Sequence, residues 1–252
     1  MADVGAKPQL LLLSGLLCDA TAWSDVPARL ADLAAVRVLS FPDFDSIGAM
    51  AQHTLELVSG RFAVAGHSMG ARVALEVIHR APQRVTGIAL LNTGVHPVRP
   101  GEAESRGRLV ALAREQGMRA LAAAWLPPMM GASAGRVAAL QPALIAMIER
   151  ATPQSFAAQV KALLCRPDAQ SVLSEIKVPT LLASGTADRW SPLAQHAQMQ
   201  AAVAHATLAA IPDSGHMAPA EQPAAVAALL REWLLSVRRA AASTDAASRA
   251  TT

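Results

Sequence analysis

The sequence predicts an α/β fold with a doubly wound, mostly parallel sheet of about six strands flanked by helices. The main observation is an alternation of short apolar runs with longer helix-like stretches. Apolar runs bounded by Gly, Pro, Asp or Ser are typical of strands buried on both faces of a parallel sheet. Strand–helix alternation implies right-handed crossovers. With 252 residues, 52% of them hydrophobic and 16% charged, the chain can also bury a sizeable core.

Six apolar runs of four or five residues are the expected strands, and helical patterns separate most of them. In chain order the expected strands are Leu10–Leu13, Val36–Leu39, Phe62–Ala65, Gly87–Leu91, Thr180–Ala183 and Thr207–Ile211. The expected helices of this core are Val26–Ala35, Ser46–Ser59, Met69–Arg80, Leu193–Ala204 and Pro223–Val237. The last of these carries apolar residues at helical spacing along one face.

One long segment interrupts the alternation. Between about Val95 and Leu173 we find no strand pattern, only helical patterns at Glu102–Gln116, Met118–Trp125, Ala134–Arg150 and Gln154–Leu164. Long insertions in α/β folds tend to lie over the active site. We therefore expect residues 95–173 to form a helical cap on a core domain made of residues 1–94 and 174–238. Residues 239–252 are rich in Ala, Ser and Thr without apolar periodicity, and we expect a flexible C-terminal tail.

Composition excludes several classes of protein. A net charge of +3, no long basic run and the absence of Tyr argue against a nucleic-acid partner. No apolar run approaches the ~18–20 residues that span a bilayer, so we expect no membrane association. Cys18 and Cys165 are too few for a disulfide framework and have no zinc-type spacing, so we expect two thiols and no metal. Leu17 before Cys18 is too bulky for a signal cleavage site, and we expect a cytoplasmic monomer or homodimer.

The strongest motif is Gly66-His67-Ser68-Met69-Gly70. It follows an expected strand and precedes an expected helix, which is the context in which a GxSxG pattern forms a nucleophile elbow. The glycines are needed because the turn is too tight for Cβ atoms beside the serine. The turn presents the Ser68 hydroxyl at a helix N-terminus, where the helix dipole and free N–H groups favour developing negative charge. Ser68 is therefore the predicted nucleophile.

A serine hydroxyl needs a base, and the chain order that accompanies this motif is Ser, then an acid, then His. Asp188 and His216 each follow an expected strand, at the sheet edge where ligand sites gather in open α/β folds. We predict that His216 takes the proton of Ser68 and returns it to the leaving group, while Asp188 orients the imidazole and stabilises its cation. Alternatively, Asp188 is a helix N-cap and the acid is Asp168, Glu175 or Asp213.

The reaction also needs hydrogen-bond donors for an oxyanion and a pocket for the substrate. We expect the donors to be the backbone N–H groups of Met69 and Leu16, with Leu17 as the alternative to Leu16. Methionine-rich surfaces adapt to varied apolar ligands, although at helical spacing the same residues also form ordinary core. The residues expected to line the substrate pocket are Leu17, His67, Trp125, Met129, Met130, Trp190 and Met217.

Taken together, these motifs resemble the α/β-hydrolase superfamily over nearly the whole chain. The resemblance is carried by LSGLLCDATAW, GHSMGARVA, ALLNTG, VPTLLASGTADRWSP and DSGHMAPAEQP. The layout is similar to small esterase-like members, among them 3-oxoadipate enol-lactonases, the carboxylesterase of biotin synthesis and the C–O-eliminating synthase of menaquinone synthesis. The stretch from Arg106 to Pro153 looks like the lactonase cap. One departure is Ser14-Gly15, where many members carry His-Gly.

The resemblance and the motifs together imply a cofactor-independent serine hydrolase. It would cleave a carboxylic ester or lactone of a small to medium, mostly apolar substrate through an acyl-enzyme on Ser68. Arg72 matches an arginine that the menaquinone-pathway enzyme uses for its acidic substrate, which makes it a candidate substrate contact. One alternative is a lyase or C–C bond hydrolase of the same fold acting on an acidic substrate, and another is a non-catalytic small-ligand receptor. The former would be favoured by cap arginines converging on the pocket, namely Arg106, Arg108, Arg114 and Arg119.

Overall fold

A parallel six-stranded sheet forms the centre of the computed structural model, which describes residues 7–250 and side chains as far as residue 243. The strand order is β2-β1-β3-β4-β5-β6, and every neighbouring pair is parallel. The predicted α/β fold is confirmed, and each expected strand lies within an observed one. The strands are β1 (Gln9–Leu13), β2 (Ala35–Leu39), β3 (Phe62–His67), β4 (Val85–Leu91), β5 (Thr180–Gly185) and β6 (Thr207–Ile211).

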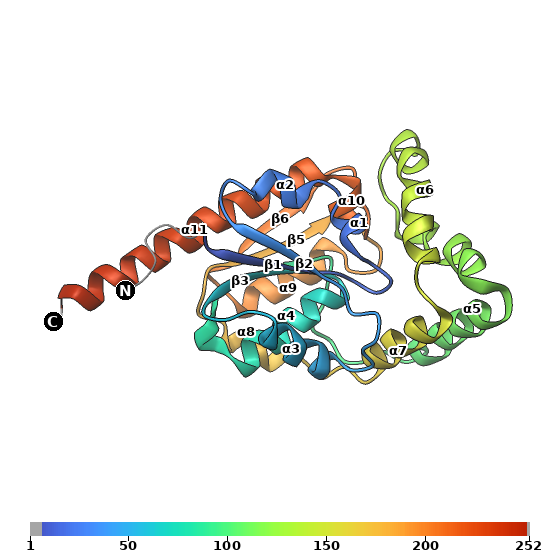
Figure 1. Cartoon of the computed structure of the whole chain (residues 1–252), viewed down its shortest axis with the longest axis horizontal. Coiled ribbons are helices and arrows are strands. Elements are labelled where there is room, and N and C mark those ends of the chain that lie inside the picture. The colour runs from blue at the N-terminus through green and yellow to red at the C-terminus, as the bar shows by residue number, and fades with distance from the viewer. Residues whose placement is uncertain (1–6, 251–252) are drawn as a thin grey trace.

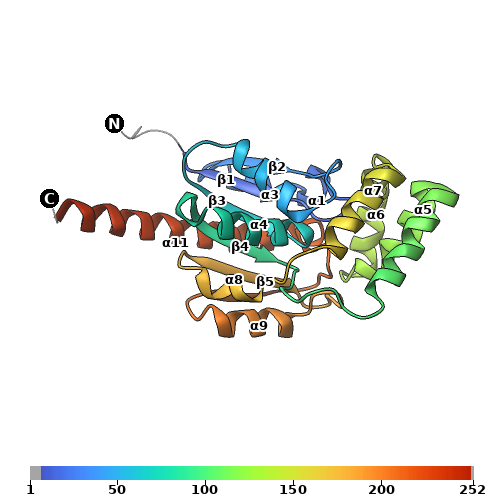
Figure 2. The same cartoon turned by 90° about the horizontal axis from the view of Figure 1, so that it is seen from below.

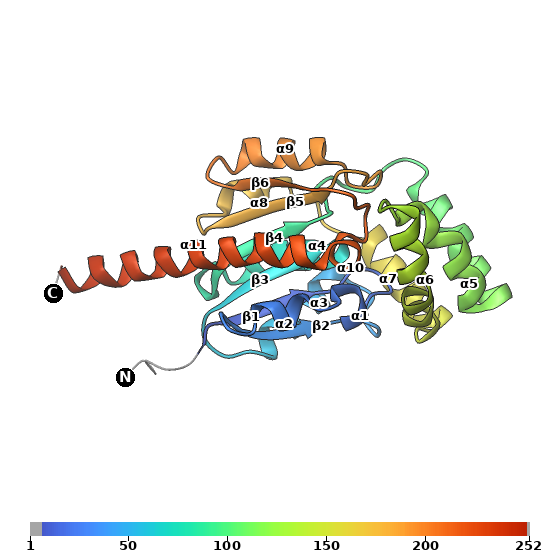
Figure 3. The same cartoon turned by 90° about the horizontal axis from the view of Figure 1, so that it is seen from above.

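Helices cover both faces of the sheet (Figures 2 and 3). On one face lie α3 (Ile47–Glu56), α4 (Met69–Arg80), α8 (Gln170–Glu175) and α9 (Leu193–Ala202). On the other lie α1 (Ala20–Trp23), α2 (Val26–Leu30), α10 (Ala218–Glu221) and α11 (Pro223–Ala250). Successive side chains of a strand point to opposite faces, so β1 feeds two apolar clusters. Leu10 and Leu12 pack in one cluster, and Leu11 and Leu13 pack in the other.

Residues 95–173 contain no strand, as the sequence predicts. Their long helices α5 (Glu102–Trp125), α6 (Ala134–Glu149) and α7 (Pro153–Leu164) stand together beyond the carboxyl ends of the strands (Figures 1 and 3). Gly117, with φ of 84°, breaks α5 at the point where two separate helical patterns were expected. A short 3₁₀ turn, Pro127–Met129, follows α5 and returns the chain towards the core. These three helices are the structural counterpart of the expected cap.

The C-terminal helix is longer than predicted. Helix α11 continues to Ala250 and projects from the body of the molecule (Figure 1). Residues 239–250, for which no helix was expected, continue α11, while residues 251–252 lie outside the described part. Alanine and arginine are strong helix formers, so a helix already nucleated by an amphipathic stretch propagates even where the apolar periodicity ends. Within residues 7–250, none of the helices has the length and hydropathy to cross a lipid bilayer.

Candidate active site

Ser68 occupies a sharp turn between β3 and α4. Its backbone has φ of 54° and ψ of −113°, a conformation that L-residues rarely adopt. Two glycines make the turn possible by allowing backbones to touch. A Cβ on Gly66 would lie 2.4 Å from the backbone of Ala71, and a Cβ on Gly70 would lie 2.0 Å from the carbonyl oxygen of Leu13. The predicted nucleophile-elbow geometry is therefore present, with Ser68 at the start of α4.

The three predicted residues Ser68, His216 and Asp188 form a continuous hydrogen-bond chain. Nε2 of His216 lies 2.8 Å from Oγ of Ser68, and Nδ1 of His216 lies 2.9 Å from Oδ2 of Asp188. Asp188 follows β5 and His216 follows β6, which are neighbouring strands. With Nδ1–H donating to the carboxylate, Nε2 is left to accept the hydroxyl proton.

Asp188 is buried, yet it is held in its charged form. Oδ1 accepts the N–H groups of Trp190 and Ser191 at 2.8 and 3.0 Å, and Oδ2 also accepts Nδ2–H of Asn92 at 2.8 Å. Burial alone raises the pKa of Asp188. The hydrogen bond and charge of His216, followed by the contacts from Asn92 and Ser191, outweigh burial and hold that pKa well below its usual range. The carboxylate is thus able to stabilise a histidine cation.

The alternative assignments of the acid do not fit the structure. Helix α9 begins after Pro192, which occupies its N-cap position, so Asp188 does not cap it. The alternative acids Asp168, Glu175 and Asp213 contact Gln170, His79 and Ser133, respectively. Of these four carboxylates, Asp188 is the one that contacts His216.

Asn92 is a site residue that the sequence analysis missed. It directly follows β4 and is fully buried, with φ of 50°. Its Nδ2 donates to Oδ2 of Asp188 and, at 3.1 Å, to the carbonyl oxygen of Gly215. Asn92 thereby connects the loop of Asp188 to the loop of His216. The available signal was its place at the end of a buried strand, next to the strand ends that carry Ser68 and Asp188.

His67 contacts both the backbone and the ring of His216. Its Nε2 lies 2.7 Å from the backbone oxygen of His216, and the two ring centroids are 5.5 Å apart. Burial, followed by the charge of His216, lowers the pKa of His67 to about 4. The His67 ring is therefore neutral at pH 7, and its Nε2–H donates to the His216 carbonyl. Besides lining the pocket, His67 thus has a positioning contact that the sequence did not predict.

The loop after β1 packs against the elbow. A Cβ on Gly15 would lie 3.3 Å from Cβ of Ser68. The N–H of Leu16 donates to no atom of the described chain. The N–H of Leu17 instead donates to Oε1 of Gln159, a buried residue of α7, at 2.9 Å. Of Leu16 and Leu17, only Leu16 has an N–H without a partner among the described residues, and Leu16 lines a cavity together with Ser68.

Met69 provides the second free N–H at this point. It is the first residue of α4, and the first N–H groups of a helix have no partner within the helix. Leu16 lines one cavity together with Ser68, and Met69 lines another, so the two residues approach the serine from different segments of the chain.

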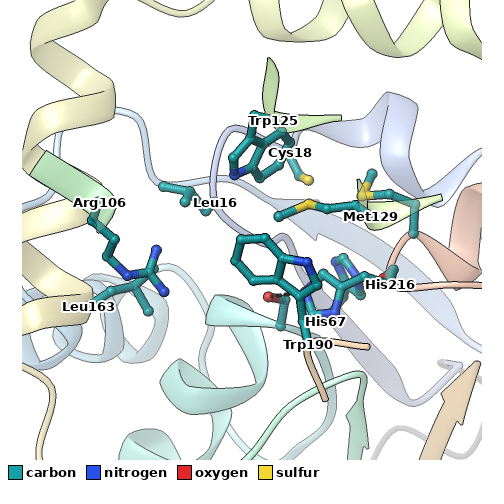
Figure 4. Close-up of a pocket in the computed structure, with 11 residues that line it drawn as sticks. Leu16, Cys18, His67, Arg106, Trp125, Met129, Leu163, Trp190 and His216 are labelled. Carbon is teal, nitrogen blue, oxygen red and sulfur yellow. Dashed lines mark hydrogen bonds between the residues drawn. The ribbon is translucent and has the colours of Figure 1, made fainter. Parts of the chain in front are cut away.

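A small cavity of about 30 Å³ lies against Ser68 (Figure 4). A water needs ~10–15 Å³ by this measure, so the cavity holds about two water-sized groups. Leu16 and Arg106 are among its walls. Neither Leu17 nor Met130 lines it. Five of the predicted pocket residues do, namely His67, Trp125, Met129, Trp190 and Met217.

A second cavity, of about 800 Å³, opens from the same serine. Its walls carry one carboxylate, Glu102, which Arg106 and Arg166 contact at 2.9 and 2.7 Å. The expected apolar lining therefore describes only the small cavity. Of the four cap arginines named above, only Arg106 reaches the cavities. The arginines that line the large cavity are Arg72, Arg99, Arg106, Arg166 and Arg189.

Arg72 is a buried cation with no carboxylate partner among the side chains of residues 7–243. It is 8% exposed, and its Nη2 donates to the carbonyl oxygen of His96 at 2.9 Å. Its Nη1 is buried and has no hydrogen-bond partner in the described chain. Burial, followed by the charge of Arg166, lowers the pKa of Arg72 to about 9. Both observations show that the protein leaves the Arg72 guanidinium incompletely compensated.

The two cysteines are free thiols, as predicted. Cys18 lines the small cavity, and burial raises the pKa of its thiol to about 12. Among the described residues, no group of three or more His, Cys, Asp or Glu side chains is arranged to hold a metal ion.

Comparisons with known proteins identify the family. The esterase from Thermogutta terrifontis, solved with malate bound, is 29% identical with a TM-score of 0.82, covering 92% of this chain and 91% of that one. The enol-lactonase from Burkholderia xenovorans LB400 is 25% identical with a TM-score of 0.77, covering 92% and 93%. The 2-succinyl-6-hydroxy-2,4-cyclohexadiene-1-carboxylate synthase of Enterobacter sp. (strain 638) is 26% identical over 245 residues, which are 90% of this chain and 92% of that protein. The model of the Alpha/beta hydrolase family matches residues 10–229, and the chain belongs to that family.

Proposed function

We propose that the protein is a cofactor-independent serine hydrolase that cleaves a carboxylic ester or lactone through an acyl-enzyme on Ser68. The observation that carries the proposal is the hydrogen-bond chain from Ser68 through His216 to Asp188, at 2.8 and 2.9 Å, beside two cavities. A serine on an elbow with a buried, ionised acid behind its base has the arrangement of an activated nucleophile.

The reaction follows from these positions. Oγ of Ser68 attacks the carbonyl carbon while His216 takes the hydroxyl proton, and the N–H groups of Leu16 and Met69 stabilise the oxyanion. The tetrahedral intermediate collapses and expels the alcohol, which receives the proton from His216. Water then attacks the acyl-enzyme with His216 as base, releasing the acid and restoring Ser68.

The two cavities suggest how the substrate is divided. The small apolar cavity accommodates a short group of about two heavy atoms on one side of the scissile carbonyl. The large cavity accommodates the rest, and its excess of arginine favours an anionic group there. A ligand carboxylate beside Arg72 would supply the counter-charge that the described residues do not provide.

A second candidate function is a lyase or C–C bond hydrolase acting on an acidic substrate. The arginines of the large cavity are compatible with it, because they would bind the acidic group of such a substrate as well as that of an ester. Two similar proteins are linked to acidic molecules: the esterase was solved with malate bound, and the synthase is named for a carboxylate. We place the esterase first because the small cavity and the two free N–H groups suit acyl transfer.

The first test is hydrolysis of 4-nitrophenyl esters from acetate to decanoate by wild type beside Ser68→Ala. We expect turnover that falls steeply with acyl length and is absent from the variant. If wild type turned over none of the esters faster than Ser68→Ala does, the proposal of an esterase would be refuted. The lyase would then be tested with acidic enol and C–C bond substrates.

A matched pair of esters tests the anionic group. We expect monomethyl succinate to be preferred over neutral dimethyl succinate, and Arg72→Met to reduce that preference about tenfold or more, as loss of a charged hydrogen-bond partner does. An unchanged ratio of kcat/KM values in Arg72→Met would show that Arg72 does not contact the substrate.

A further inference from the structure

A buried carboxylate connects the cap to the loop that carries His216. We propose that Glu221 is a positioning residue, which fixes the place of His216 by fastening this loop to the cap. The inference rests on the proposed function, because it concerns the base of that reaction. Glu221 touches neither Ser68 nor the cavities, so it would act through the backbone.

The hydrogen bonds of Glu221 run to two separate parts of the chain. Glu221 ends α10 and is fully buried. Its Oε1 accepts the N–H of Gly215 at 2.9 Å, and Gly215 directly precedes His216. Its Oε2 accepts the N–H groups of Gly131 and Ala132, at 2.7 and 2.6 Å, in the turn between the 3₁₀ segment and α6. One side chain therefore holds the histidine loop and the cap together.

The two backbones are also in direct contact. The N–H of His216 donates to the carbonyl oxygen of Met129 at 2.7 Å. A Cβ on Gly131 would lie 2.5 Å from the nitrogen of Gly215, and a Cβ on Gly215 would lie 2.5 Å from the oxygen of Met129. No space separates the segments, so a displacement of the cap turn would displace His216 as well.

The hydrogen bonds to Glu221 are strong because a buried, charged carboxylate accepts them. The Glu221 carboxylate has no ion-pair partner within the described residues, so its charge is satisfied by three backbone N–H groups. Charge-assisted bonds of this kind are about twice as strong as neutral ones, and burying the charge without them would be costly. His216 in turn must keep two bonds, of 2.8 and 2.9 Å, at once. A misplacement of ~1 Å can cost about 10²-fold in rate.

A neighbouring carboxylate provides a matched control. Asp213 lies in the same loop and also binds the cap, accepting the N–H of Ser133 at 2.8 Å. It is exposed, and it does not contact Gly215 or His216. If merely attaching the cap were sufficient, Asp213 would matter as much as Glu221.

The decisive variant is Glu221→Gln. The amide keeps one acceptor oxygen and replaces the other with a donor, so either Gly215 or the pair Gly131 and Ala132 loses its partner. We expect kcat for 4-nitrophenyl acetate to fall about 10- to 100-fold while KM changes less than about threefold. Asp213→Asn should stay within about twofold of wild type. Gly131→Ala, which pushes on Gly215 from the cap, should lower kcat in the same way.

A double-variant cycle distinguishes positioning from a general loss of structure. In a His216→Ala background, Glu221→Gln should cause no further loss of the residual activity, because its effect passes through His216. An equal loss in both backgrounds, or an equal loss in Asp213→Asn, would overturn the proposal. Thermal unfolding of each variant identifies any that fails to fold, and Gly131→Ala then carries the test.

A spectroscopic signal separates this inference from the proposed function. The Nδ1–H proton between His216 and Asp188 should give a far-downfield proton resonance in wild type and Asp213→Asn, and this resonance should shift or disappear in Glu221→Gln and Gly131→Ala. An unchanged resonance in both variants would contradict the positioning role. If wild type hydrolysed no ester but the resonance responded as expected, the proposed function would fail and the positioning role would stand.

Discussion

Asn92→Asp should place a second carboxylate against Asp188, so that the two compete for one proton. The substitution preserves the shape of the side chain, and aspartate tolerates φ of 50° about as well as asparagine. It replaces the Nδ2 donor, 2.8 Å from Oδ2 of Asp188, by an oxygen. Both residues are buried, at 0% and 4% exposure, so the two carboxylates would face each other away from water.

The size of the effect follows from this distance. Two unit charges 2.8 Å apart repel by ~6 kcal/mol at an effective dielectric constant of about 20. That corresponds to about four powers of ten in proton affinity, which is enough to keep one proton on the pair at neutral pH. Asp188 then loses much of the charge that stabilises the cation of His216. Neutralising the acid of such a triad costs up to ~10⁴-fold in kcat, and we expect a loss of roughly 10²- to 10⁴-fold at pH 7.

Activity and stability should respond to pH in opposite directions. The activity of Asn92→Asp should recover as the pH rises and the shared proton leaves. The repulsion raises the pKa of the pair above that of an unfolded aspartate, so the folded state binds more protons than the unfolded state. The free energy of unfolding therefore falls as the pH rises through the same range.

The assay is kcat/KM for 4-nitrophenyl acetate, with Ser68→Ala as the blank, together with urea unfolding between about pH 6 and 9. Asn92→Gly is the control, because glycine accepts the positive φ and removes the donor without adding charge. Its loss of activity should not depend on pH beyond the wild-type profile. If Asn92→Asp showed the same pH profile as Asn92→Gly, the reasoning about repulsion would be refuted.

Two further predictions concern stability. Gly70→Ala places a Cβ 2.0 Å from the backbone oxygen of Leu13. Because the backbone cannot move aside as a side chain can, we expect the free energy of unfolding in urea to fall by ~3 kcal/mol or more. A fall below ~0.5 kcal/mol would show that the elbow adjusts freely. Burial raises the pKa of Glu102, but Arg166, with Arg106, outweighs this and lowers it from 4.5 to about 2. Because the folded pKa lies below the unfolded one, the contribution of Glu102 is complete above pH 4.5 and is lost as the pH falls towards 2. Glu102 is only partly buried, so solvent screening reduces this contribution. Glu102→Gln should therefore be less stable than wild type by ~1–2 kcal/mol at pH 7 and nearly equal to it near pH 2, and equal stability at pH 7 would contradict this.

Local patterns in the sequence were sufficient to place the strands and to single out Ser68, Asp188 and His216, which the structure joins in one hydrogen-bond chain. Buried strands of a parallel sheet appear as short apolar runs, and Ser68, Asp188 and His216 follow such runs within a few residues. The helices α5 to α7 were also predictable, because Pro127, Pro128 and Pro153 lie at the ends of two of them. The helix over residues 239–250 was not expected, because missing periodicity was considered without helix propensity.

The residues that were missed act through partners far away in the chain. Asn92 reaches Asp188 across 96 positions, and Glu221 reaches Gly131 across 90. Gln159 of the cap reaches the loop after β1 across 142 positions. No local pattern indicates such bonds, because they exist only after the sheet order is fixed. The arginines of the large cavity are likewise brought together from several elements by the topology.

Cys18 gives the pocket a property of a different kind. A thiol with a pKa of about 12 is almost entirely protonated at neutral pH, and only the thiolate reacts readily with alkylating agents and oxidants. The small cavity therefore contains two potential nucleophiles, Cys18 and Ser68, and only Ser68 has a base beside it. Iodoacetamide should leave Cys18 unmodified, whereas a fluorophosphonate should label the pocket at Ser68. Reagents that modify a thiolate should therefore leave activity at Ser68 intact, unlike the activity of hydrolases whose nucleophile is a thiolate.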